Sequence, residues 1–235
     1  MNSIKGLIFD FDGLILDTET PEYEVWCDIY SRYGSALSIE DWALCLGSSP
    51  EAFDAVGNLQ NLTKLALDQA ALRQEHRIRS LELIERASPL PGIVELLSYA
   101  RKANLPVGLA SSSKRNWVEE HLKRIKLEHF FDCIFCQDDV AEVKPAPDLY
   151  LLALEYLHLT SRDAVAFEDS PNGITAAQRA GIFCVGVPNP VSRLLITDHA
   201  DMIVSSLAEF EPHFLLDIIW AEMHKNHHHK EIPKI

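Results

Sequence analysis

The chain of 235 residues contains no apolar run of the 18 or so residues that a transmembrane helix requires. The first residues, MNSIKGLIF, also lack the charged, apolar and small-residue regions of a secretion signal. We therefore expect no membrane span and a cytoplasmic location. Hydrophobic residues still make up 47% of the chain and charged residues 24%, a balance typical of a globular protein with a substantial core.

Basic residues are scarce, with 21 Lys and Arg against 35 Asp and Glu and a formal net charge of −14. Binding to a phosphate backbone requires a basic surface, so we expect no nucleic-acid partner. The same charge constrains any anionic substrate. Its attraction must come from a local cation or metal ion, because the overall field of the protein repels it.

Cysteine is also sparse, and the count of five is odd. Cys133 and Cys136 have the spacing of a redox pair or of half a zinc site. They lie within an apolar, strand-like run, however, and no second pair accompanies them. We interpret the cysteines as buried thiols of a reducing compartment.

Short apolar runs alternate with helical patterns along much of the chain, which predicts an α/β fold with a Rossmann-like parallel sheet covered on both faces. The predicted strands are Ile4–Phe11, Pro106–Ser111, Cys133–Cys136, Ala164–Glu168, Ile182–Val187 and Met202–Val204. Parallel sheets of this kind bind ligands at the carboxyl ends of their strands, where the strand order reverses.

The alternation stops between residues 17 and 86, where we find only helical periodicity. One predicted helix carries Tyr23, Trp26 and Ile29 on one face and ends at Gly34. A longer helical stretch covers residues 62–87. The strand and helix pattern resumes at Leu90-Pro91-Gly92. We therefore predict a catalytic core formed by residues 1–16 and 87–235, with an inserted helical cap formed by residues 17–86.

The C-terminal region combines a predicted helix with a polar tail. The helix has its apolar residues at helical spacing and should pack on the core. These residues are Phe210, Phe214, Leu215, Ile218 and Ile219. Beyond it, HKNHHHKEIPKI contains four of the ten histidines. We interpret this tail as a solvated segment rather than as a metal site.

Two of the predicted strands end in pairs of acidic residues. Asp10 and Asp12 follow the first strand, and Glu168 and Asp169 end the fourth. Such residues are often solvated loop acids. Four carboxyl groups at the ligand-binding edge of one sheet instead favour a site for a hard divalent cation, and we expect Mg²⁺.

Two further strand ends carry groups that suit an anion. Ser111, Ser112 and Ser113 precede a helix predicted to begin near Asn116, where free N–H groups and hydroxyls can bind an anion. Helix capping is the commoner use of such serines. Lys144 is followed by Pro145 and Pro147, which stiffen its loop. A lysine beside prolines is commonly only a surface charge. Carboxylates, hydroxyls and a lysine at one sheet edge together indicate a phosphoryl-transfer site.

These four motifs resemble those of the haloacid dehalogenase-like hydrolase superfamily, in the beta-phosphoglucomutase-like phosphatase branch with a helical cap. The resemblance covers nearly the whole chain. It implies that Asp10 is the nucleophile that forms an aspartyl-phosphate, and that Asp12 is the general acid and base. Ser111, with Ser112 beside it, and Lys144 would bind the phosphoryl group. Mg²⁺ would be held by Asp169 with Glu168, the Asp10 carboxylate and the Asp12 backbone carbonyl.

The resemblance leaves three alternatives. A sugar phosphomutase of this family carries a histidine where this chain has Glu22, and an arginine in the loop that here reads Gly47–Pro50, so we favour a phosphatase. Ser113 and Lys114 do match the mutase pattern. Phosphonate-cleaving relatives use a cap lysine, and Lys64 shows no sign of that role. An inactive phospho-ligand-binding homologue is disfavoured because all four motifs are intact.

The substrate is the least determined feature. In this family it is selected by cap residues, here Glu19, Glu22, Trp26 and the Leu46–Ser49 loop. Acidic side chains repel an anionic tail and accept hydrogen bonds from hydroxyls. We therefore expect a small phosphorylated metabolite, a sugar or polyol phosphate. Glu19 and Glu22 could equally serve only to begin the first cap helix. The sequence does not fix the oligomeric state, and we favour a monomer.

Overall fold

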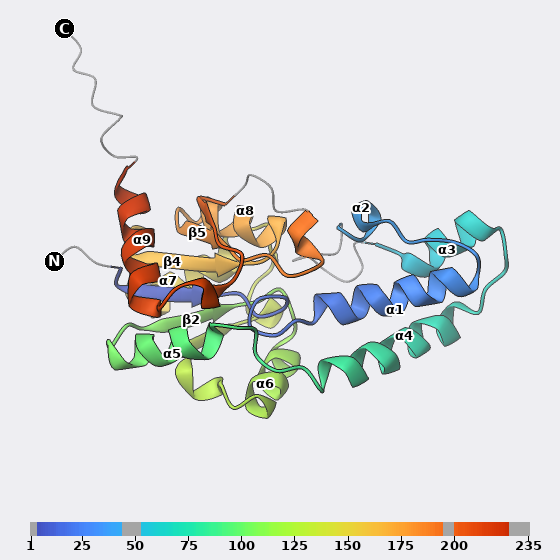
Figure 1. Cartoon of the computed structure of the whole chain (residues 1–235), viewed down its shortest axis with the longest axis horizontal. Coiled ribbons are helices and arrows are strands. Elements are labelled where there is room, and N and C mark those ends of the chain that lie inside the picture. Colours follow the sequence, from blue (N-terminus) through green and yellow to red (C-terminus); the bar gives the residue numbers. More distant parts are fainter. Residues whose placement is uncertain (1–3, 44–52, 195–199, 226–235) are drawn as a thin grey trace, which may run out of the picture.

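The fold is built on one parallel sheet, shown in Figure 1. The computed structural model describes residues 4–43, 53–194 and 200–225. Six parallel strands lie in the order β3-β2-β1-β4-β5-β6. They are β1 (Gly6–Phe9), β2 (Val107–Ala110), β3 (Cys133–Phe135), β4 (Ala164–Glu168), β5 (Phe183–Gly186) and β6 (Met202–Ile203). Each lies within a predicted apolar run, so the α/β fold with a parallel sheet is confirmed.

Alternating side chains of the strands form two apolar layers, one on each face of the sheet. Leu7 and Phe9 of β1 join one cluster, and Ile8 joins the other, as the period of two in a strand requires. The first face is covered by α5 (Ile93–Lys102), α6 (Arg115–Arg124) and α9 (Pro212–Lys225). The second is covered by α7 (Asp148–Tyr156) and α8 (Pro171–Arg179). Short 3₁₀ helices cover Glu128–Phe130, Gln137–Asp139, Ser192–Leu194 and Leu207–Glu209.

The strand order reverses at β1, which determines where a ligand can bind. Leu7 of β1 is aligned with Val107 of β2 on one side and with Val165 of β4 on the other. The crevice at a reversal of this kind opens at the carboxyl ends of the strands. Asp10, the residue after β1, lies at this crevice.

Between β1 and α5 the chain forms a segment of helices, residues 17–86, with an apolar cluster of its own. Its helices are α1 (Glu19–Arg32), α2 (Ile39–Trp42), α3 (Ala55–Thr63) and α4 (Gln69–Ile84). Trp26, Ile29 and Tyr30 are central to the cluster, which also includes Val191 from the loop after β5. Figure 1 shows these helices to one side of the sheet. We call residues 17–86 the helical segment.

The chain leaves the sheet and returns to it at adjacent points. Leu16 forms an antiparallel bridge with Pro89, and the N–H of Leu90 donates to the carbonyl of Ile15 over 2.9 Å. Gly92 then begins α5 at φ +90°, where a β-carbon would lie 2.3 Å from the backbone of Leu207. Only glycine fits this approach, which ties the return point to the loop before α9.

Two details of the predicted helices are wrong. The stretch 62–87 is broken, because α3 ends at Lys64 with φ 60° and Asp68 begins α4 by accepting a hydrogen bond from the Ala71 N–H over 3.0 Å. In α9 the side chain of Phe214 is 51% exposed, and Leu216 is buried in its place. Apolar type and helical spacing alone did not identify which of these neighbours faces the sheet.

Several other predictions concern features outside the sheet. In the described part of the chain Cys27, Cys133, Cys136 and Cys184 are free, and burial raises the pKa of Cys133 and of Cys136 to about 12, as expected of unreactive thiols. None of the described helices is both long and apolar enough to cross a membrane. The Leu46–Ser49 and Gly47–Pro50 loops and the histidine-rich tail beyond residue 225 lie outside the described residues.

Candidate active site

Asp10 and Lys144 form a buried ion pair at the carboxyl end of β1. Asp10 is 6% exposed and Lys144 1% exposed. The Lys144 ammonium group donates to the Asp10 carboxylate and, over 2.6 Å, to Oε1 of Glu168. Burial alone would lower the pKa of Lys144, but the charges of Asp10 and Glu168 more than reverse this effect and raise it. Lys144 is therefore a fixed positive charge at this edge of the sheet.

Three buried carboxyl groups converge on the same point. Asp10, Glu168 and Asp169 each place one carboxylate oxygen within 4.8 Å of the others. Burial, followed by repulsion from Glu168, raises the pKa of Asp10 to about 8. Burial and the charge of Asp10 raise the pKa of Asp169 well above its usual range. One ammonium group does not balance three carboxylates, and oxygen ligands of this type suit a hard divalent cation.

Glu168 is the most enclosed of the three acids. Besides Lys144, the hydroxyl of Tyr150 donates to its Oε1, and the Ser170 hydroxyl lies 3.5 Å from its Oε2. A β-carbon at Gly173, in the first turn of α8, would lie about 2 Å from this carboxylate. Glu168 thus links the lysine to the start of α8, whereas Asp169 is nearer to the crevice residues after β1.

Asp12 accepts hydrogen bonds at both carboxylate oxygens. Its Oδ1 accepts from the Thr18 hydroxyl and from the indole N–H of Trp117, each over 2.9 Å. Its Oδ2 accepts from the Ser113 hydroxyl over 2.6 Å and from the Ser111 hydroxyl over 3.4 Å. The donors come from the start of the helical segment, from α6 and from the loop after β2. All three parts of the chain therefore meet at this side chain.

The serines after β2 are not the cap of α6. Lys114 is the capping residue of that helix and makes no side-chain capping bond. Ser111 is buried, Ser112 is half-buried, and the Ser111 hydroxyl accepts a hydrogen bond from the Ser113 N–H over 3.0 Å. The hydroxyls of Ser111 and Ser113 point toward Asp12, so the capping alternative does not account for them.

Glu19 and Glu22 occupy the first turn of α1 and also face the acidic site. Burial, then the charges of Glu22, Asp12 and Asp10, raise the pKa of Glu19 well above its usual range. Burial and then the charge of Asp12 raise the pKa of Glu22 to about 7. Position in the first turn would by itself stabilise the charged form, so burial and the neighbouring carboxyl groups outweigh that effect on the pKa of both side chains.

Asn189 is a site residue that sequence reasoning missed. It lies in the loop after β5, is 3% exposed, and donates from Nδ2 to Oδ2 of Asp169 over 2.7 Å. A Pro-Asn-Pro stretch reads first as a turn. Its position in the sequence could have identified it. Asn189 follows β5, and β5 ends at the same edge of the sheet as β1 and β4.

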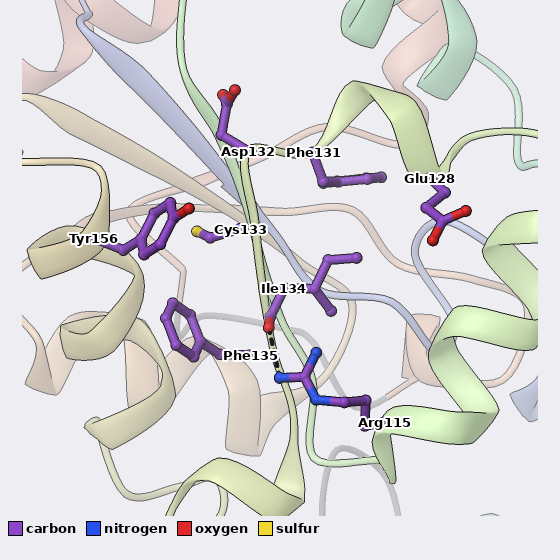
Figure 2. A pocket seen from close by; sticks show the side chains of 8 residues that line it. All are labelled: Arg115, Glu128, Phe131, Asp132, Cys133, Ile134, Phe135 and Tyr156. Atoms are coloured by element: carbon purple, nitrogen blue, oxygen red, sulfur yellow. Dashed lines mark hydrogen bonds between the residues drawn. The ribbon is translucent and has the colours of Figure 1, made fainter.

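The hollow beside β3 is separate from this site. It has a volume of about 420 Å³ and lies at the outer edge of the sheet, as Figure 2 shows. Arg115 donates to the carbonyl oxygen of Ile134 over 2.9 Å and pairs with Asp139 over 2.6 Å. A charged side chain bound to an edge carbonyl blocks pairing with another strand, so Arg115 protects the edge.

Comparisons with known proteins agree with the fold and the motifs. The haloacid dehalogenase-like hydrolase family matches residues 7–187. "Putative phosphatase YhcW" of Bacillus subtilis (strain 168) is 44% identical over 91% of this chain and 97% of its own length. Fructose-1-phosphate phosphatase YqaB of Escherichia coli (strain K12) is 35% identical over 77% of this chain and 95% of its own length.

The beta-phosphoglucomutase branch is represented as well. Beta-phosphoglucomutase of Bacillus subtilis (strain 168) is 30% identical over 88% of this chain and 95% of its own length. The crystal structure of CbbY from Rhodobacter sphaeroides in complex with phosphate has a TM-score of 0.70 and 28% identity, covering 91% of this chain and 99% of that one. The family match and the phosphatase relatives together support a phosphoric monoester hydrolase. The chain belongs to the haloacid dehalogenase-like hydrolase family, in its beta-phosphoglucomutase branch.

Proposed function

We propose that the protein is a Mg²⁺-dependent phosphatase that hydrolyses a small phosphorylated metabolite through an aspartyl-phosphate on Asp10. The observation that carries this proposal is the buried contact between Asp10 and Lys144, beside Asp169 and two residues before Asp12. A carboxylate nucleophile and a phosphate ester are both anions, so their approach requires positive charge at the point of attack. Lys144 provides it.

The reaction divides between two aspartates. A carboxylate oxygen of Asp10 attacks phosphorus, and the bond from phosphorus to the ester oxygen breaks. Asp12 gives its proton to that leaving oxygen and later takes a proton from the water that cleaves the aspartyl-phosphate. Ser111 and Ser112, which follow β2, would donate hydrogen bonds to the phosphoryl oxygens.

The carboxyl groups fit a bound magnesium ion. Asp10 and Asp169 would hold it together with the Asp12 backbone carbonyl, and Glu168 would contribute through the carboxylate that also binds Lys144. Magnesium supplies Lewis-acid stabilisation of negative charge on the phosphoryl group. Oxygen-only ligands match the preference of this ion, and the negative charge left by three acids and one lysine supports a cation.

We further propose that the helical segment is a cap that selects the substrate. The two chain segments that connect it to the sheet pair with each other, Leu16 with Pro89 and Ile15 with Leu90. The two segments can therefore act together as one hinge for the cap. Glu19 and Glu22 face the site from α1. Carboxyl groups in this position suit the hydroxyls of a sugar or polyol phosphate, the chemistry in the name of the relative YqaB.

The test is release of phosphate from a panel of phosphorylated metabolites, with and without Mg²⁺. We expect release to require Mg²⁺ and to stop in excess chelator, and Ca²⁺ to substitute poorly because it prefers more ligands and longer bonds. Full release in chelator would remove the metal from the mechanism.

Two variants test the roles of the aspartates. Asp10→Asn should abolish release, and Asp12→Asn should lower it by at least about 10². Asp10→Asn should stay folded, because the amide keeps nearly the same shape and Lys144 keeps its buried ion pair with Glu168. Rapid release by a purified, folded Asp10→Asn protein would contradict the proposal. Conversion of a sugar phosphate into its isomer, in place of phosphate release, would instead favour a mutase.

A further inference from the structure

Asn189 is held in a single orientation by the loop that carries it. Its Oδ1 accepts hydrogen bonds from the N–H groups of Val191 and Ser192 over 2.9 and 2.8 Å. Its own N–H donates to the Ser192 hydroxyl over 3.0 Å. Backbone N–H groups can only donate, so the oxygen of the amide must face the loop and the Nδ2 group must face the other way.

The Nδ2 group points at the acidic site. It donates to Oδ2 of Asp169 over 2.7 Å and to the carbonyl of Gly13 over 3.3 Å. Gly13 has φ +79°, and a β-carbon there would lie 2.2 Å from Oδ2 of Asp169 and 2.6 Å from Nδ2 of Asn189. The three groups are packed so closely that no side chain fits at Gly13.

We propose that Asn189 is a positioning residue that fixes the Asp169 carboxylate for the metal ion. This inference rests on the proposed Mg²⁺-dependent phosphatase. Asp169 is repelled by Asp10 and Glu19, and without a donor its carboxylate would turn away from them. The amide satisfies one oxygen and leaves the other for the ion. Hydrogen bonds of this kind set the orientation of carboxylate ligands, and their loss costs about 10- to 100-fold in metal affinity or activity.

The experiment measures metal binding directly, with Mn²⁺ as the probe because it accepts the same oxygen ligands and gives an electron paramagnetic resonance signal when free. Asn189→Ala should raise the Mn²⁺ dissociation constant about tenfold or more. The Mg²⁺ concentration for half-maximal phosphate release should rise by a similar factor. The KM for substrate at saturating Mg²⁺ should change by less than about twofold.

Ser192→Ala is the matched control, because it removes a hydrogen bond from the same loop and leaves the Asn189 amide in place. It should change the Mn²⁺ dissociation constant by less than about twofold. Where Asn189→Ala does not fold, Asn189→Ser serves, since its hydroxyl can accept from the loop but does not reproduce the amide donor. The measured melting temperature of each variant shows that it is folded.

Three results would overturn the inference. Unchanged Mn²⁺ affinity in Asn189→Ala shows that the amide does not position Asp169. Equal losses in Asn189→Ala and Ser192→Ala show that the loop, and not the donor, matters. If the wild-type protein releases phosphate but binds no metal, the proposed cofactor is wrong and the role of Asn189 falls with it. In the first two cases the phosphatase itself stands.

Discussion

The carboxylate of Asp12 is oriented by donors that differ in what they can do during a reaction. The hydroxyls of Thr18, Ser111 and Ser113 can rotate, and each can also accept a hydrogen bond. The indole N–H of Trp117 can only donate, and it comes from a side chain held against His121 at a ring distance of 4.2 Å. When Asp12 changes between acid and base, the hydroxyls can follow. The Trp117 indole cannot change in this way, so it keeps the Asp12 carboxylate in one position.

Trp117→Phe tests this role, because it keeps the aromatic packing and removes the N–H. We expect kcat for phosphate release to fall about tenfold, as the loss of about 1.4 kcal/mol implies, with KM changed less than about twofold. The matched control is Trp220→Phe on α9, because Trp220 packs against the same apolar cluster and also lies against a histidine, His224, with ring centres 4.4 Å apart. Equal kcat in the wild type and Trp117→Phe would mean that the hydroxyls alone orient Asp12.

The chemistry-bearing residues were predictable where they follow strands directly. Asp10, Glu168 and Asp169 come at the ends of apolar runs, and parallel strands bring such ends to one edge. The role predicted for Lys144, binding the phosphoryl group, came from the family resemblance more than from its local sequence. Thr18, Trp117 and Asn189 were not predicted, because their roles depend on contacts 6, 105 and 20 residues away. Each residue type also has a commoner local explanation.

At the scale of elements, α1 and α4 are joined by a half-buried histidine. His76 of α4 stacks on Trp26 of α1 with ring centres 4.3 Å apart, and its Nε2 lies 3.0 Å from the carbonyl oxygen of Glu22. A carbonyl only accepts, so Nε2 carries the proton. Burial, and then the charge of Arg79, lowers the pKa of His76 to about 4, although the contact with Glu22 opposes this.

This shift predicts a loss of stability in acid. The pKa of His76 is about 6.5 in the unfolded chain and about 4 when folded, so the unfolded state binds the proton more readily between these values. The contribution of neutral His76 is complete above pH 6.5 and is lost as the pH falls to 4. At 1.36 kcal/mol per unit, the loss is about 3 kcal/mol.

His76→Phe keeps a ring against Trp26 and removes the titration. Urea unfolding at pH 7 and pH 4.5 should show a smaller decrease in the free energy of unfolding for this variant than for the wild type. Groups with a raised pKa, such as Glu22, instead add to the free energy of unfolding as the pH falls. They do so equally in both proteins, so the comparison removes their effect. The same decrease in both proteins would show that titration of His76 does not contribute to the loss of stability in acid.

The helices show where sequence reasoning about elements is limited. The apolar spacing in α1 predicted its end at Gly34, which has φ 68° just past Arg32. The break between α3 and α4 was missed, because Lys64 is an ordinary helix former that adopts φ 60° only in this tertiary setting. The proximity of Val191 to the helical segment was also not predictable, because Val191 and Leu72, the buried member of the cluster nearest to it in sequence, are 119 positions apart along the chain.

At the scale of the whole molecule, the net negative charge of the protein and the acidic residues of the site both repel an anionic substrate. The chain carries a net charge of −14, and Glu19 and Glu22 add carboxyl groups beside Asp10 and Asp12. Lys144 and the proposed metal ion would offset the phosphoryl charge, whereas a second anionic group near Glu19 and Glu22 would be repelled by their charged forms. We therefore expect the site to disfavour substrates with a carboxylate. The raised pKa values of Glu19 and Glu22 leave them partly protonated near neutral pH, so their repulsion is partial, whereas both protonation states can hydrogen-bond to hydroxyls.

We accordingly expect a higher kcat/KM for hexose, pentose or polyol phosphates than for phosphoglycolate. Glu22→Gln should narrow this difference, because it removes one of the acids that face the substrate. Glu24→Gln is the matched control, since Glu24 lies on the same helix with its side chain exposed, and it should leave the preference unchanged. A preference for phosphoglycolate of tenfold or more, about 1.4 kcal/mol in transition-state binding, would contradict the argument. Glu19 and Glu22 would then serve only to begin α1.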